Sequence, residues 1–127
     1  MISMPFKKFG DIHQYKEIKA GESDRIFYLT IPVSHAGFLW YLYASWYPDT
    51  YLVMKIDGEV AEVIRRQIGE PNKPFKFNIP YLITSEIEFW GYNDSSDDHY
   101  FEVFCDGEVY DESLGRRQIY AQINRSK

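Results

Sequence analysis

The chain lacks most of the features that would tie it to a small set of functions. It has one cysteine, Cys105, in 127 residues, so no internal disulfide can form and the fold must depend on its hydrophobic core. It has fewer lysine and arginine residues (14) than aspartate and glutamate residues (19), which disfavours binding to nucleic-acid phosphates. No apolar run resembles a secretion signal, and no segment reaches transmembrane length. We therefore expect neither nucleic acid nor membrane as a partner, and no secretion.

Motifs for catalysis and cofactor binding are also missing. The three histidines, His13, His35 and His99, match no zinc-binding, metalloprotease or catalytic-triad spacing, and there is no glycine-rich phosphate loop. Ser34-His35 lies in a predicted turn without a nucleophile-elbow pattern. Cys105 falls on the inward side of a predicted strand, where a cysteine behaves as a small hydrophobe. The sequence therefore predicts a non-enzymatic protein without a cofactor.

One loop has the composition of a weak calcium site. Residues 93–99 read NDSSDDH, and Asp94, Asp97 and Asp98 could supply some of the six or more oxygens that calcium needs. The glycine and the terminal glutamate of an EF-hand are absent. The same residue types are typical of a turn that binds no ion. We therefore assign no metal to the chain and keep this loop as the only candidate.

What the sequence does contain is a set of repeated motifs. Three motifs occur twice in the same order: FYLTIP at 27–32 and FKFNIP at 75–80, DGEV at 57–60 and 106–109, and RRQI at 65–68 and 116–119. The offset between the copies drifts only from 48 to 51 residues. Ordered recurrence of this kind indicates a structural repeat. The two similar halves are placed at about 27–70 and 75–121.

The two halves read as short strands. Aromatic residues make up 18% of the chain, and flat or β-branched side chains favour strands. Pro32 cannot donate to a ladder and so ends a strand, while Asp57-Gly58 fits a two-residue hairpin turn. The expected strands cover residues 27–31, 38–47, 51–56, 60–68, 75–79, 85–92, 99–105 and 118–124.

Eight strands at this spacing predict an all-β, eight-stranded, jelly-roll-like β-sandwich. We expect a single domain over residues 26–127 that is built from two similar four-stranded halves. Residues 1–25 lie outside the repeat and are expected to form an N-terminal arm with one added strand at about 14–19. A helix over Glu59–Arg66 is the one helical alternative.

Alternation along each strand separates an inward from an outward face. The inward sets include Leu52, Met54 and Ile56, but strand 38–47 has aromatic side chains on both faces. Soluble monomers rarely expose large apolar patches, and Tyr and Trp are enriched where proteins bind one another. Loops or the arm could cover these rings instead. The interface or ligand candidates are Trp40, Tyr41, Tyr43, Trp46, Tyr47, Trp90, Tyr92 and Tyr100.

Residues 21–110 are similar in style to a known group of proteins. The run GESDRIFYLTIP, a Tyr/Trp strand, YPDTYLVMKIDGEV and then PFKFNIPYLITSEIEFWGYNDSSDDHYFEVFCDGEV resembles small jelly-roll structural proteins of bacteriophage virions, namely capsid decoration and head or tail accessory proteins. The shared features are Ile-Pro at a strand end, an Asp-Gly hairpin and a hydrophobic strand closing near an Asn-rich loop. The resemblance carries over no functional residue.

The resemblance implies a homo-oligomer, commonly a trimer, that is clamped onto other virion proteins of the capsid or tail. Such a subunit is assembled in the host cytoplasm and resides in the virion. The alternative hypothesis is a carbohydrate-binding, lectin-like module, in which Trp40, Trp46 or Trp90 would stack on the sugar rings of a glycan.

Overall fold

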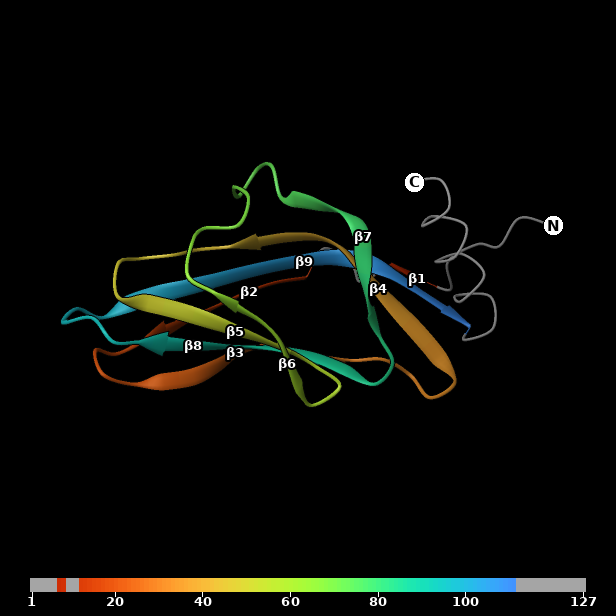
Figure 1. Cartoon of the computed structure of the whole chain (residues 1–127), viewed down its shortest axis with the longest axis horizontal. Coiled ribbons are helices and arrows are strands. Elements are labelled where there is room, and N and C mark those ends of the chain that lie inside the picture. The colour runs from red at the N-terminus through yellow and green to blue at the C-terminus, as the bar shows by residue number, and fades with distance from the viewer. Residues whose placement is uncertain (1–6, 9–11, 112–127) are drawn as a thin grey trace.

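The computed structural model describes residues 7–8 and 12–111, and this part of the chain consists of strands joined by turns and loops (Figure 1). The strands found in it are β1 (Lys7–Lys8), β2 (Ile12–Ile18), β3 (Ser23–Thr30), β4 (His35–Ala44), β5 (Thr50–Ile56), β6 (Glu59–Ile64), β7 (Phe75–Ile83), β8 (Glu86–Asn93) and β9 (His99–Asp111). The prediction of an all-β fold is confirmed. The same residues contain no helix that is long and apolar enough to cross a membrane.

The strands form two antiparallel sheets that pack against each other around one core (Figure 1). In the first sheet β7, β4 and β9 are neighbours in this order, and both β1 and β2 pair with the other side of β9. In the second sheet the order is β3-β8-β5-β6. From β2 onward, consecutive strands alternate between the sheets except within the β5–β6 hairpin. This double-sheet arrangement is that of a jelly roll, as the sequence predicts.

Each sheet takes strands from both halves of the sequence, so the two halves share the sheets. The two DGEV copies also have different environments. The first forms the β5–β6 turn, whereas the second, at 106–109, lies inside β9, where Asp106 and Gly107 pair with Tyr41 and Leu39 of β4. Because β9 is held between β4 on one side and β1 and β2 on the other, ladder hydrogen bonds keep this segment extended. The second RRQI copy, at 116–119, lies outside the described residues.

Several strand bounds differ from those expected. β7 continues through Pro80, because an edge strand tolerates a residue that has no N–H to donate. β9 extends beyond Cys105 to Asp111, because ladder hydrogen bonds to strands on both of its sides keep it extended. The helix considered for Glu59–Arg66 is wrong, since Glu59–Ile64 forms β6. The strand expected over 118–124 lies outside the described residues.

The segment expected to be an N-terminal arm contributes to the sandwich. β2 pairs with β9 over its whole length, from Ile12 opposite Cys105 to Ile18 opposite His99. Ile18 is buried in the core, and β3 already begins at Ser23. The added strand predicted near residues 14–19 is therefore present, and it provides one edge of the first sheet.

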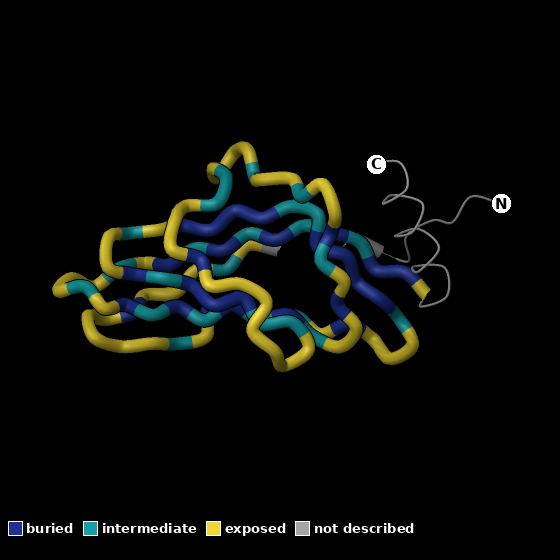
Figure 2. Tube along the Cα trace, viewed as in Figure 1, coloured by how far each residue is buried: buried dark blue, intermediate teal, exposed yellow. Residues whose placement is uncertain are grey.

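The core lies between the two sheets and contains large apolar side chains from both. Buried residues recur along the strands of both sheets (Figure 2). The predicted inward residues Leu52, Met54, Phe101, Val103 and Cys105 are all buried. Full burial of each large apolar side chain contributes about 1.5–3 kcal/mol. Strand alternation in the sequence therefore identified most of the core correctly.

A β-bulge in β4 explains why this strand shows no simple alternation. The register with both β7 and β9 shifts between Leu39 and Tyr41, so Trp40 is an extra residue. Simple alternation would place Phe38 and Trp40 on the same face as Leu42, but the bulge moves the inward position from Leu39 to Leu42. Phe38 and Trp40 instead join a second apolar cluster, which also contains Ala36 and Tyr110.

The Asp57-Gly58 turn is hydrogen-bonded to the neighbouring β7–β8 turn. Asp57 and Gly58 have φ angles of 54° and 84°, as the predicted type I′ turn requires. The Asp57 carboxylate accepts hydrogen bonds from the backbone N–H groups of Thr84, Ser85 and Glu86, and from the hydroxyls of Thr84 and Ser85, at 2.7–3.2 Å. Partial burial raises the pKa of Asp57, but these hydrogen bonds outweigh burial and lower the pKa to about 2. The β5–β6 and β7–β8 turns are thereby joined.

Candidate functional site

The aromatic residues proposed from the sequence do not form one patch. Tyr41 and Tyr43 on β4 and Tyr100 on β9 lie on the outer face of the first sheet. Trp90 and Tyr92 on β8 lie on the outer face of the second sheet, and Trp40 lies at the β4 bulge. Trp46 and Tyr47 lie in the connection between β4 and β5. Seven of the eight are half-buried or exposed; Tyr43 is buried, so its ring is not offered to a partner.

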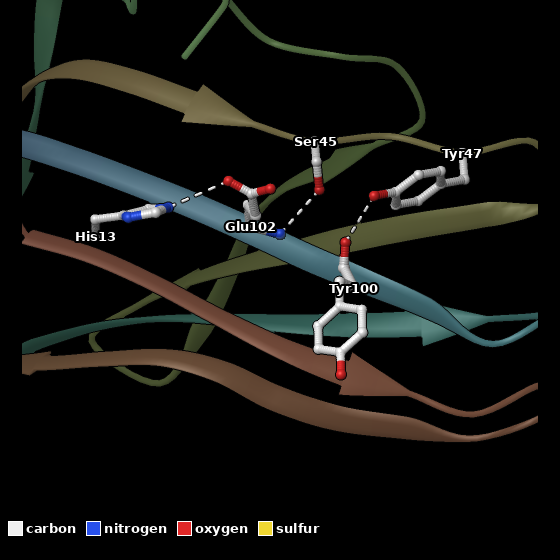
Figure 3. A network of polar contacts seen from close by, with 5 residues as sticks. All are labelled: His13, Ser45, Tyr47, Tyr100 and Glu102. Atoms are coloured by element: carbon white, nitrogen blue, oxygen red, sulfur yellow. Dashed lines mark hydrogen bonds and ion pairs between the residues drawn. The ribbon is translucent and has the colours of Figure 1, made fainter. Parts of the chain in front are cut away.

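The outer face of the first sheet carries a polar network that joins three strands (Figure 3). His13 Nε2 of β2 lies 3.2 Å from Glu102 Oε2 of β9. The Glu102 N–H donates to Ser45 Oγ at 2.9 Å, and the Tyr47 hydroxyl donates to the Tyr100 carbonyl at 2.8 Å. These contacts connect β2, β9 and the end of β4. Their role is to hold the sheet together.

On the outer face of the second sheet, cations cover several aromatic rings. The Arg25 guanidinium lies 4.3 Å from the Tyr28 ring centroid, and Lys55 Nζ lies 5.6 Å from the Trp90 ring. The Trp90 indole N–H is buried without an acceptor among the described residues. Trp90 therefore presents a shielded ring, which fits poorly with sugar stacking at this position.

A hollow of about 280 Å³ lies next to Trp46 at the end of the sandwich where β4 joins β5 and β8 joins β9. We call it the loop-end hollow. Its lining comes from three segments and consists of Trp46, Asp49, Thr50, Tyr51, Arg65 and Asp94. Trp46 is one of the aromatic candidates from the sequence, and Asp94 is one of the calcium candidates. It therefore combines an aromatic ring with charged groups of both signs.

A second hollow of about 200 Å³ lies between the edge strands β6 and β7, and we call it the open-side hollow. Leu42 and Met54 of the core form part of its lining, and Phe75, Phe77 and Tyr81 of β7 line it in a chain of edge-to-face ring contacts. The remaining lining residues are Glu62, Ile64, Arg66, Gln67, Ile68 and Gly69. The hollow is mainly apolar, and Glu62, Arg66 and Gln67 add polar groups to it.

None of the residues of the open-side hollow is among the sequence-predicted site residues. Residues 75–79 were expected to form a strand that ends at Pro80. A proline within a strand pattern is a signal for an edge strand, because a central strand needs every N–H for its ladders. If Pro80 is taken as the mark of an edge strand, the apolar residues Phe75, Phe77 and Ile79 predict an exposed apolar edge.

The acidic loop 93–99 is held by its own polar side chains. Asn93 is fully buried; its amide donates to the carbonyls of Ile18 and Asp97, both at 2.8 Å, and its oxygen accepts from the Ser95 hydroxyl at 2.6 Å. The Asp98 carboxylate accepts from the Ala20 N–H at 2.9 Å. Within residues 7–8 and 12–111, no group of three or more His, Cys, Asp or Glu side chains could hold a metal ion, so Asp94, Asp97 and Asp98 do not converge.

Comparison with known proteins finds no family model and no curated protein that matches this chain.

Proposed function

We propose that this chain is a non-enzymatic structural subunit of a bacteriophage virion, namely a capsid decoration protein or a head or tail accessory protein. In this proposal it is assembled in the host cytoplasm, forms a homo-oligomer, most simply a trimer, and contacts other virion proteins. The resemblance of residues 21–110 supports the assignment to a virion. The exposed apolar open side of the sandwich supports association with protein.

The two edge strands at the open side have backbone groups that other chains can pair with. Within the described residues, β6 pairs only with β5, and β7 only with β4. The other side of each strand therefore presents N–H and C=O groups, and an extended segment of another subunit can add to such an edge. The strands lie on either side of the open-side hollow, so an added segment could also place a side chain there.

Apolar side chains surround this edge. Five of the exposed large hydrophobic residues lie on β6 and β7, with exposed fractions of 43–58%: Val60, Val63, Phe75, Ile79 and Leu82. Scattered apolar residues are normal on a surface, but several of them along two unpaired edge strands beside an apolar hollow are typical of an interaction site. This cluster at the open side is the observation that carries the proposal.

The occupant that we propose for the open side is a second copy of this chain. In a trimer, which is closed by head-to-tail contacts, edge strand β6 of one copy would pair with edge strand β7 of the next, and their aliphatic side chains would pack together. The chain has a net charge of −5, and its two edge strands carry opposite charges: Glu59 and Glu62 lie on β6, and Lys76 lies on β7. Self-association through this side therefore avoids placing many like charges together.

The test is the mass of the full chain in solution, measured by light scattering over a concentration series. We expect a defined oligomer for the wild type and a monomer for Ile79→Asp, because a carboxylate at the centre of the interface would lose its water without a partner. Val33→Asp is the matched control: Val33 is 92% exposed in the β3–β4 turn, so this variant should keep the wild-type mass. A wild-type monomer at every concentration would overturn the proposal.

A further inference from the structure

The loop-end hollow presents one aromatic ring in a fixed orientation. The Trp46 side chain is 37% exposed, and its indole N–H donates to the Thr50 carbonyl at 3.0 Å. The Thr50 hydroxyl donates to the Tyr47 carbonyl at 2.7 Å, which closes the turn between them. Asp49 in this turn has a φ of 61°, in the left-handed region. The ring is therefore held by the backbone of its own loop and does not need to be ordered on binding.

Two aspartates from different loops line the same hollow. Asp49 belongs to the β4–β5 connection and Asp94 to the β8–β9 connection, and the Asp94 N–H donates to the Asp49 carbonyl at 3.0 Å. This backbone hydrogen bond fixes the distance between the loops. Within the described residues, neither carboxylate accepts a hydrogen bond or forms an ion pair, and both residues are exposed. Both therefore remain able to accept hydrogen bonds from a ligand.

A guanidinium lines the third side of the hollow. Arg65 Cζ lies 4.4 Å from the centroid of the Tyr51 ring, and the Tyr51 ring stacks on Tyr92 at 4.8 Å with an interplanar angle of 1°. The stacked rings give the guanidinium a rigid support. A planar guanidinium on a ring still directs its N–H donors sideways within its own plane. Arg65 thus adds hydrogen-bond donors to the same hollow that Asp49 and Asp94 line.

We infer that the loop-end hollow is a binding site for a saccharide. The two carboxylates would repel an anionic ligand, and the guanidinium would repel a cationic one. The charges of the hollow therefore favour a neutral ligand with many hydroxyl groups. The apolar C–H face of a sugar ring would lie on Trp46, Asp49 and Asp94 would accept hydrogen bonds from hydroxyls, and Arg65 would donate to a sugar oxygen.

The size of the hollow defines how much of a glycan it can hold. Its volume of about 280 Å³ is slightly below the range of about 300–1,000 Å³ that is usual for sites of drug-sized ligands. One sugar unit would therefore be bound, and a longer glycan would continue into solvent. With few contacts to a single sugar, we expect a dissociation constant in the millimolar range.

The experiment titrates the full-length protein with D-glucose, D-galactose, D-mannose, L-rhamnose and N-acetyl-D-glucosamine. Binding is followed by tryptophan fluorescence and by amide chemical shifts in NMR spectra. At least one sugar should shift the amides of the loops that carry Asp49 and Asp94. No response to any of these sugars would overturn the inference.

Two variants locate the site. Asp94→Asn keeps the shape of the side chain and removes its charge, and should weaken binding about tenfold, because a hydrogen bond to a charged acceptor is stronger than one to a neutral amide. Trp46→Ala should abolish binding. Unchanged affinity in Asp94→Asn would contradict the inference, whether or not Trp46→Ala folds. Trp40→Phe is the matched control, because Trp40 lies at the β4 bulge near Lys76 and should leave sugar affinity unchanged.

This inference is independent of the proposed oligomer. The loop-end hollow and the open-side hollow share no lining residue. A monomeric protein could still bind the sugar, and an oligomer could fail to bind it. Failure of one test is therefore distinguishable from failure of the other.

Discussion

The Asp57 carboxylate should be one of the strongest single polar contributors to the stability of this fold. It receives hydrogen bonds from three backbone N–H groups and two hydroxyls of residues 84–86, more than 25 positions away in the sequence. We predict that Asp57→Asn lowers the free energy of unfolding at neutral pH. Asparagine tolerates the positive φ of this position. However, it carries no charge, and its NH₂ group would face groups that are themselves donors.

The lowered pKa of Asp57 gives the size of its expected contribution to the free energy of unfolding. Lowering the pKa from 3.8 to about 2 corresponds to at most about 2.4 kcal/mol, since one pKa unit is about 1.36 kcal/mol. The residue is exposed, so screening by water reduces this to about 1 kcal/mol. Because the folded-state pKa is lower than the unfolded one, the contribution is fully present above the unfolded value. It is lost as the pH falls from about 4 through about 2.

The assay is urea denaturation of the wild type and Asp57→Asn, followed by tryptophan fluorescence at a series of pH values. The difference between the two proteins should be constant near neutrality and shrink as the pH approaches about 2. Asp49→Asn is the matched control, because Asp49 also has a positive φ but its carboxylate accepts no hydrogen bond among the described residues. Equal stability of wild type and Asp57→Asn at neutral pH, or a difference that stays constant down to about pH 2, would refute the reasoning.

Two further predictions concern two glycines with positive φ and the buried cysteine. Gly58→Ala and Gly69→Ala both place a side chain at positive φ, which costs about 1–2 kcal/mol. A Cβ at Gly58 would meet open space, but a Cβ at Gly69 would lie 2.6 Å from the Phe75 N. Thermal unfolding should therefore show a clearly larger loss of stability for Gly69→Ala than for Gly58→Ala. Equal losses of stability would contradict this close approach. Burial raises the pKa of the Cys105 thiol, so a thiol reagent should modify Cys105 only after unfolding, and rapid modification of the folded protein would show that the core is not closed around it.

Features that depend on neighbouring residues could be predicted from the sequence. Strands β5 and β8 were placed within a residue or so, because alternation and strand-forming side chains are local signals. The Asp57-Gly58 turn was predicted because two adjacent positive φ angles suit these residue types. Burial of Phe101, Val103 and Cys105 on β9 followed from alternation alone, whereas buried Val109 and Tyr110 lie beyond the strand that was expected. Of the residues that line the loop-end hollow, the sequence identified Trp46 and Asp94 as separate candidates. It did not predict that they line the same hollow.

The sequence alone determined that this chain forms strands with apolar inward faces and that an Asp-Gly hairpin lies in its first half. Only the tertiary structure decided which strands pair, and the two DGEV copies show why. The same four letters form a turn after β5 and continuous strand inside β9, because the strands beside β9 supply hydrogen bonds that outweigh the local preference for a turn. The two hollows likewise depend on residues far apart in the chain, whose meeting is set by sheet order and by the β4 bulge.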